Sequence, residues 1–71
     1  NNSTAVGEEA TAKADRATAI GNYSSATGYG SIAVGVGSNS GGAGSITLGQ
    51  EAVSAGAMAL AVGAMGMSLL A

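Results

Sequence analysis

The chain has 71 residues, a net charge of −2 and 13 glycines, and it contains no cysteine, histidine, proline, phenylalanine or tryptophan. These absences exclude disulfides, a His/Cys zinc site and an aromatic core, and two basic residues are too few to neutralise nucleic-acid phosphates. Ordering the backbone costs about 1–2 kcal/mol per residue while the side chains offer little area for burial, so we expect stability to depend on oligomerisation.

Glycine recurs every 14 residues, each time after Val, Ile or Leu, at Gly7, Gly21, Gly35, Gly49 and Gly63. The pattern also holds at half this period. Ten seven-residue units, the first starting at Thr4, all have Ala, Ser or Thr second, and eight have Gly fourth, with exceptions at Ala14 and Leu70. A period this strict predicts a solenoid. Because the sequence opens at Asn1 in mid-repeat, we expect residues 1–71 to be one repeat domain from a longer chain.

A seven-residue period is also typical of coiled coils, but 13 glycines inside helices would cost on the order of 10–13 kcal/mol. Strands fit better, because side chains in a strand alternate between two faces. In residues 31–35, Ser31 and Ala33 point one way, and Ile32 and Val34 point the other. The same alternation predicts strands, in chain order, over residues 17–21, 31–35, 45–49 and 59–63, with small residues sharing a face in the intervening segments 24–28 and 52–56.

Each 14-residue coil therefore has two short strands whose small faces meet. This predicts an all-β fold, a thin parallel β-roll (solenoid) of about five coils, at about 4.8 Å per coil and roughly 20–25 Å in length. Its interior would be lined by Ala, Ser and Gly, with hydroxyl groups bonded to the backbone near the turns. Glycine at the turns would allow positive φ where the chain reverses.

Residues 55–71 are nearly all apolar, which raises the alternative of a membrane helix. The stretch is slightly shorter than the roughly 20 residues that a bilayer demands. The 14-residue register also continues through Gly63. We therefore expect no membrane contact by this segment.

The two outer faces of the predicted solenoid differ in polarity. On the first strand of each coil, large apolar residues point outward, and burying them would contribute about 12–24 kcal/mol per chain at roughly 1.5–3 kcal/mol each. The outward positions of the opposite strand begin with residues that suit water, such as Thr11, Lys13 and Ser25. One face is therefore suited to protein contact and the other to solvent. The apolar stripe consists of Val6, Ile20, Ile32, Val34, Ile46, Leu48, Leu60 and Val62.

Residues 19–28 (AIGNYSSATG) and 32–38 (IAVGVGS) resemble the SVAIGxxSxAxG repeat in the head of YadA-like trimeric autotransporter adhesins, and the resemblance covers nearly the whole chain. It implies a left-handed parallel β-roll that packs as a homotrimer around a threefold axis, with the apolar stripe as the trimer interface. It also implies a head exposed at the outer membrane of a Gram-negative bacterium. The chain departs from the repeat at Thr4 and Ala14 in the first coil, and at Leu70.

The residues give no support to catalysis or cofactor binding. A Ser-His site needs histidine, and the nine serines are explained by the solenoid interior. The glycine-rich run at 41–44 lacks the Asp of calcium-binding repeats, and the GxG motifs at 28–30 and 35–37 lack the last glycine of a dinucleotide fingerprint. We therefore expect no enzyme, cofactor or metal site.

Two functions remain. The first is adhesion in virulence, in which the outer face binds host matrix such as collagen, fibronectin or laminin. Many copies on one surface would turn weak binding by a single head into avid binding. The second is a structural spacer or cap without a ligand of its own. An ice-binding face ranks third, because the outward Thr4 and Thr18 give way to Ile32 and Ile46. The possible ligand face consists of Thr11, Ser25, Thr27, Asn39, Tyr23 and Tyr29.

Two features of that surface have alternative interpretations. Tyr23 and Tyr29 could anchor a protein partner or pack over a turn. Five of the six charged residues lie in the first coil, where they either solvate that end or form a ligand patch.

Overall fold

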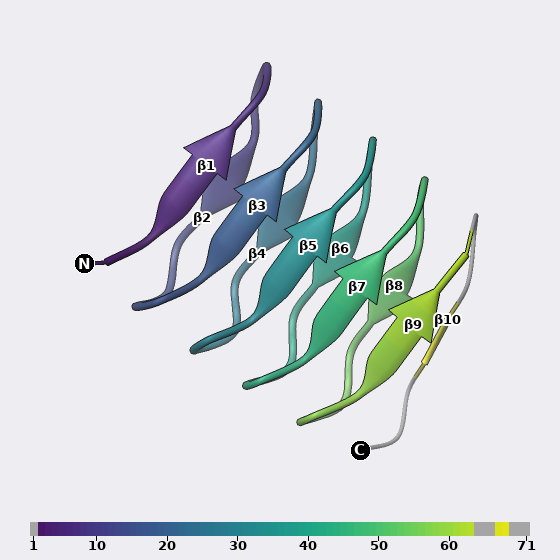
Figure 1. The fold of residues 1–71 in the computed structure, drawn as a ribbon. Coiled ribbons are helices and arrows are strands. Elements are labelled where there is room, and N and C mark those ends of the chain that lie inside the picture. The colour runs from purple at the N-terminus through teal and green to yellow at the C-terminus, as the bar shows by residue number, and fades with distance from the viewer. Residues whose placement is uncertain (1, 64–66, 69–71) are drawn as a thin grey trace.

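In a computed structural model of the chain, residues 2–63 and 67–68 are described. They form ten short strands that alternate between two parallel five-stranded sheets (Figure 1). Sheet A contains β1 (Thr4–Val6), β3 (Thr18–Ile20), β5 (Ile32–Val34), β7 (Ile46–Leu48) and β9 (Leu60–Val62). Sheet B contains β2 (Thr11–Ala12), β4 (Ser25–Ala26), β6 (Asn39–Ser40), β8 (Val53–Ser54) and β10 (Met67–Ser68). The strands are shorter than the predicted spans because their flanking residues belong to the turns.

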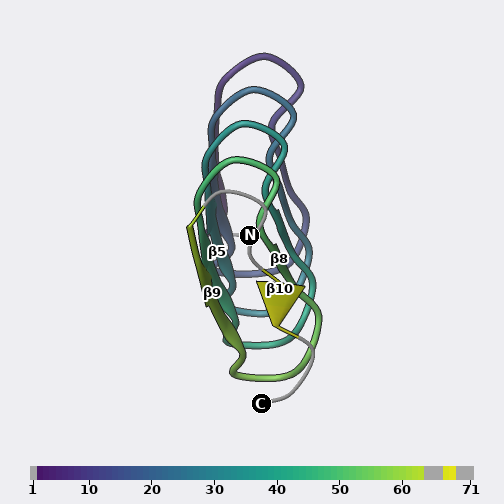
Figure 2. The same ribbon diagram turned by 90° about the vertical axis from the view of Figure 1, so that its right-hand side faces the viewer.

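The molecule is an all-β parallel solenoid of about four turns, with no helix among the described residues. Each strand pairs with the strand 14 residues further along, as in Ala19 with Ala33. Seen along the stack, the coils superpose as a flattened loop with one sheet on each long side (Figure 2). The Cα positions extend over 26 × 21 × 10 Å, so the solenoid is thin, as predicted. Part of the predicted fifth coil, including Leu70, lies outside the described residues.

The interior contains only small side chains. Ala19, Ala26 and Ala33 are completely buried, and so are Ser31 and Thr47, while the alternate residues of the same strands face outward. The alternation read from the sequence therefore places the core correctly. In the first coil, Ala5 is exposed because β1 lies at the open end of sheet A.

The stacked glycines have two different physical causes, and the sequence-based expectation covers only one of them. Gly7, Gly21, Gly35, Gly49 and Gly63, which follow the sheet A strands, all have φ between 111° and 128°. After the sheet B strands, Gly28 and Gly42 do not have positive φ. A Cβ on Gly28 would instead lie 2.3 Å from the carbonyl oxygen of Gly42, so glycine is required there by the close approach of the next coil. The expectation that glycine allows positive φ where the chain reverses holds for the turns after the sheet A strands and does not account for Gly28 and Gly42.

Most of the buried hydroxyl groups have hydrogen-bond partners, as expected for a solenoid lined with serine. The Ser24 hydroxyl donates to the Gly21 carbonyl at 2.8 Å, and the Ser54 hydroxyl donates to the Ile46 carbonyl at 3.0 Å. Ser40 and Ser45 bond to each other at 2.6 Å across the third coil. Ser31 is the exception among the described buried side chains, because its Oγ has no partner. Ser45, one coil later, bonds to Ser40, but the residue that corresponds to Ser40 in the coil of Ser31 is Ala26, which has no hydroxyl group.

We expect Ser31→Ala to raise the free energy of unfolding by about 1 kcal/mol. The substitution removes a buried hydroxyl that makes no hydrogen bond, and an unsatisfied buried polar group costs about 1–3 kcal/mol. Ser45→Ala is the matched control at the same position of the next coil. It should destabilise the protein, because it leaves the Ser40 hydroxyl without its partner. Urea denaturation of both variants tests the assignment, which is contradicted if the two shift in the same direction.

The membrane-helix alternative for residues 55–71 finds no support in the part of the chain that the structure describes. Residues 60–62 form β9, and residues 67–68 form β10. Within residues 2–63 and 67–68, no helix is long and apolar enough to cross a bilayer.

Candidate interaction surfaces

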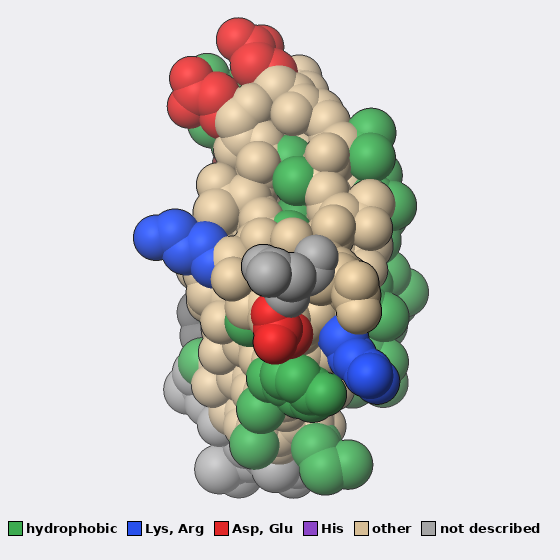
Figure 3. All heavy atoms as spheres, turned by 90° about the vertical axis from the view of Figure 1, so that its left-hand side faces the viewer, with side chains coloured by type: hydrophobic (Ala, Val, Ile, Leu, Met, Phe, Trp, Pro, Cys, Tyr) green, Lys and Arg blue, Asp and Glu red, His purple; other side chains and the backbone are tan. Residues whose placement is uncertain are grey.

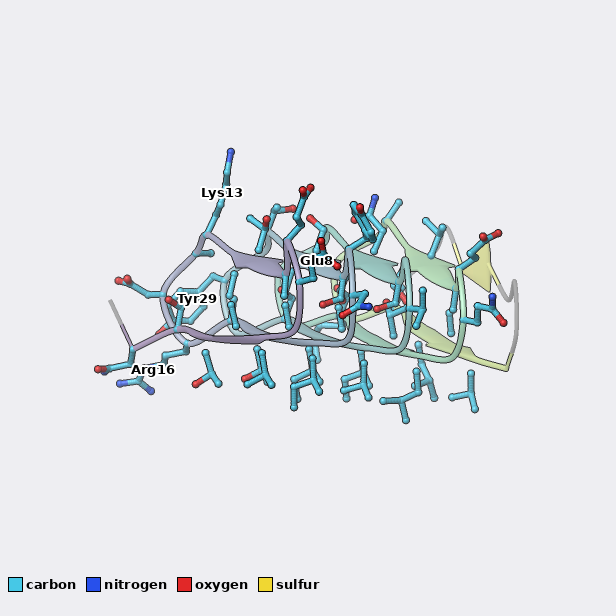
Figure 4. The ribbon with its side chains drawn as sticks, turned by 90° about the horizontal axis from the view of Figure 1, so that it is seen from above. Glu8, Lys13, Arg16 and Tyr29 are labelled. Atoms are coloured by element: carbon cyan, nitrogen blue, oxygen red, sulfur yellow. The ribbon has the colours of Figure 1, made fainter. Side chains whose placement is uncertain are left out.

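The apolar stripe lies on the outer face of sheet A. Its side chains form two rows along the stack, because the strands pair in a 14-residue register. Figure 3 shows hydrophobic side chains gathered along this side of the molecule, and Figure 4 shows a continuous row of side chains projecting from the same sheet. One row runs Thr4, Thr18, Ile32, Ile46 and Leu60, and the other runs Val6, Ile20, Val34, Leu48 and Val62.

The stripe remains accessible to solvent in the single chain. Ile46 and Leu48 in the middle of the stack are 37% and 38% exposed, and Leu60 near one end is 61% exposed. Ile32 and Val34 are half-buried. Neighbouring strands lie beside these residues, and within residues 2–63 they stay partly accessible to solvent. A contiguous apolar surface of this kind marks a protein interaction site.

The outer face of sheet B is flatter and more polar. Thr11 and Ser25 are half-buried there, while Thr27 and Asn39 are exposed. Lys13 projects from this side, away from the apolar stripe (Figure 4). The face becomes less polar toward the C-terminal end, where Val53 continues the row formed by Ser25 and Asn39.

The two tyrosines of the predicted ligand face lie apart from the other four residues. Tyr23 belongs to the turn between β3 and β4, and Tyr29 belongs to the turn between β4 and β5, at the opposite edge of the solenoid. They are 57% and 56% exposed, so neither is packed tightly over its turn. The six predicted residues are therefore distributed over three surfaces, namely sheet B and the two edges.

The edges form two further surfaces that the sequence alone did not single out. We define the first edge as the turns that follow the sheet A strands, and the second edge as the turns that follow the sheet B strands. The second residues of the first-edge turns are Glu8, Asn22, Val36 and Gln50. On the second edge, the residues two positions before the next sheet A strand are Arg16, Gly30, Gly44 and Met58. These positions could be recognised only after each half-repeat had been divided into strand and turn.

The structure gives little basis for a metal centre. In the described part of the chain, no group of three or more His, Cys, Asp or Glu side chains could hold a metal ion. The charged residues of the first coil are instead distributed between the edges and sheet B, with Glu8 and Glu9 on the first edge, Arg16 on the second and Lys13 on sheet B. This distribution does not concentrate them into one site.

Comparison with known families gives a match over most of the chain. The family model described as the YadA head domain repeat matches twice, over residues 1–24 and 26–52. Comparison with curated proteins and with solved structures gave no match. Strands β8 and β9 continue the sheet pairing of the matched repeats beyond residue 52.

Proposed function

The chain belongs to the YadA head domain repeat family, and we propose on that premise that it is the head of a trimeric adhesin at the surface of a Gram-negative bacterium. Three chains pack their sheet A faces around a common axis. The observation that carries this proposal is the apolar stripe, which runs the length of sheet A and is accessible to solvent in the described part of the chain. A homotrimer also supplies the additional burial that a core of Ala, Ser and Thr lacks.

We infer that the solenoid winds left-handed and continues through about five coils. In Figure 1 the sheet A strands lie in front and point upward, the sheet B strands return behind them, and the coils advance to the right. This course supports the left-handed winding that the family resemblance implies. The parallel pairing of β10 with β8 supports the fifth coil.

In this proposal the trimer exposes sheet B and the edges to the outside, where they bind host matrix proteins such as collagen, fibronectin or laminin. Thr27, Asn39, Tyr23 and Tyr29 are the exposed residues of the predicted ligand face that are available for such contacts. Weak binding by one head would become avid on a surface that carries many copies. The segment has no catalytic role.

The test is a solid-phase binding assay of the purified head against collagen, fibronectin and laminin, with oligomeric state measured on the same sample. Saturable binding by a trimer supports the adhesin. Absence of binding by a trimer at high micromolar concentration would favour a spacer that holds other segments away from the cell. The flat outer face of sheet B, whose side chains are mostly small, is the observation that keeps this second function open.

A further inference from the structure

The apolar surface of sheet A is most exposed near β9, and an apolar side chain outside the stripe lies beside it there. Among the described large apolar residues, Met58 has the highest exposed fraction, 78%, and Val62 and Leu60 follow with 64% and 61%. Met58 belongs to the second edge, two residues before β9. An apolar patch of this kind marks a contact with another molecule.

The backbone of the second edge shows where the Met58 side chain points. The residues two positions before β3, β5, β7 and β9 all have φ between 58° and 69°. Backbone hydrogen bonds stack these turns in the 14-residue register, as in Met58 N–H to Ala43 C=O at 2.8 Å. Figure 4 places the first residue of this row, Arg16, on the sheet A side, and Lys13 on the opposite side. Met58 has the same backbone conformation, so its side chain also leaves the second edge on the sheet A side.

Glycine occupies the two positions of this row between Arg16 and Met58. A Cβ on Gly30 would meet nothing within 4 Å, so packing within the described residues does not require glycine there. A Cβ on Gly44 would lie 3.6 Å from the Cγ of Met58, so the Met58 side chain leans toward Gly44. Met58 also holds a φ of 58°, which glycine adopts at lower cost. The row is therefore flat over the two glycines and raised at Met58.

A smooth surface lies at the other end of the sheet A strands. Each turn of the first edge begins with glycine directly after its strand, so Gly49 follows Leu48 and Gly63 follows Val62. In Figure 4 the Glu8 side chain, from the second position of such a turn, lies on the sheet B side. On the sheet A side of the first edge, the glycines therefore add no side chain next to Leu48 and Val62.

A threefold arrangement brings these two surfaces together. Three solenoids that turn sheet A toward a common axis meet edge to edge, and rotation places the second edge of each chain against the first edge of the next. The rotation also keeps equivalent residues at the same height along the axis. At about 4.8 Å per coil, Met58 lies about 3 Å above Leu48 and about 1 Å below Val62. The Met58 side chain is therefore level with the space between these two residues of the next chain.

We propose that Met58 of each chain packs between Leu48 and Val62 of the neighbouring chain and closes the corners of the trimer beside β9; this rests on the proposed trimer. The partner is a second copy of the chain, because Met58 is continuous with the apolar stripe through Leu60. Its unbranched, flexible side chain adapts to an irregular apolar surface. The contact covers the apolar side chains that are most exposed in the described part of the chain.

Disulfide formation tests the contact, because the chain has no cysteine of its own. In the Leu48→Cys/Met58→Cys variant, about 13 Å separates the two thiols across sheet A of one chain, which is too far for a disulfide. They meet only between chains, so oxidation should link at least half of the protein into a covalent trimer on a non-reducing gel. Circular dichroism and sedimentation establish that the variant is folded and assembled.

The matched control is Thr27→Cys/Leu48→Cys, in which one thiol moves to the outer face of sheet B. It carries the same substitution in the stripe, so any effect of Leu48→Cys on assembly is common to both variants. The one remaining thiol on sheet A can link chains only in pairs. The control should therefore give no covalent trimer.

Met58→Gly measures how much the contact contributes to assembly. The variant has the residue of the two preceding coils at this position, and glycine suits the left-handed φ, so the turn should be kept. Trimer association should nevertheless weaken by about tenfold or more at each corner, because a buried apolar side chain is lost. Ala57→Gly, in the same turn, is the control that should leave association unchanged. Sedimentation equilibrium measures these constants.

The outcomes separate the corner contact from the trimer itself. A trimeric wild type whose Leu48→Cys/Met58→Cys variant gives no more covalent trimer than the control would overturn the corner contact and leave the trimer standing. Association unchanged by Met58→Gly would overturn the contact as well. A monomeric wild type would overturn both the contact and the proposed trimer.

Discussion

Ile46→Asp is expected to dissociate the trimer and unfold the chain, the largest effect that we predict for a single substitution. Ile46 lies in the centre of the apolar stripe, and three copies of the new carboxylate would face one another around the axis. Each buried unpaired charge costs several kcal/mol, and the lost burial of isoleucine adds about 1.5–3 kcal/mol per chain. For each chain these costs are comparable with the roughly 5–15 kcal/mol by which folded proteins are stable, and they act on all three chains of the proposed trimer.

The measurement combines light scattering with circular dichroism. Asn39→Asp is the matched control, because it introduces the same charge on the exposed side of sheet B, on the strand that precedes β7. It should leave both signals unchanged within about 0.5 kcal/mol of stability. Ile46 is 37% exposed in the single chain, so the burial of Ile46 differs strongly from that of Asn39 only if the trimer assembles. A folded, trimeric Ile46→Asp variant would show that the inner face has been assigned wrongly.

Gly35→Ala should be the most damaging small change in the turns, and we expect it to lower the free energy of unfolding by about 3–5 kcal/mol. Gly35 has φ of +128°, far from the value near +57° at which other residues adopt left-handed backbone. A Cβ on Gly35 would also lie 2.5 Å from the carbonyl oxygen of Gly49. Backbone of the next coil cannot move away without breaking the pairing of β5 with β7.

Gly37→Ala, in the same turn, is the control at a glycine whose φ other residues adopt and whose Cβ would meet only a side chain. Its φ is +72°, and Glu9, Tyr23 and Glu51 adopt similar φ at the equivalent position. The nearest atom to a new Cβ is the Cγ of Glu51 at 3.3 Å, which belongs to a flexible side chain that can shift. We expect a loss of only about 1 kcal/mol. Urea denaturation compares the two, and equal losses would contradict the argument that φ and collision together make Gly35 more sensitive than Gly37.

The sequence was sufficient to predict the coils, the register and the inward residues, because each of these follows from a strict period. Ala19, Ala33 and Ser40 recur at fixed intervals and are buried as a strand with two faces demands. The family assignment is likewise confirmed by the repeat match over residues 1–24 and 26–52. Periodicity carried these predictions because every coil repeats the same environment.

The features that escaped prediction depend on contacts between coils or between chains. A glycine that combines positive φ with a close carbonyl and a glycine that only makes room for a carbonyl look the same in a sequence, so Gly21 and Gly28 could not be distinguished. The separation of Tyr23 from Tyr29 required knowledge of where each turn reverses the chain. An apolar stripe predicts a partner surface but gives no copy number, and for that reason the trimer interface and the ligand face stay predictions.

The hydrogen bonds between coils also determine how this head responds to mechanical force. Bonds such as Thr18 N–H to Ser31 C=O and Gly35 N–H to Ile20 C=O connect successive coils, and they therefore run along the length of the stack. A pull on the two chain ends in that direction opens one row at a time instead of shearing all rows together. Each released coil extends from about 4.8 Å to roughly 46–50 Å, since a fully stretched chain spans about 3.3–3.6 Å per residue. Tension would thus unravel the solenoid in steps of 14 residues, and in the proposed trimer the other two chains would have to share the load to prevent it.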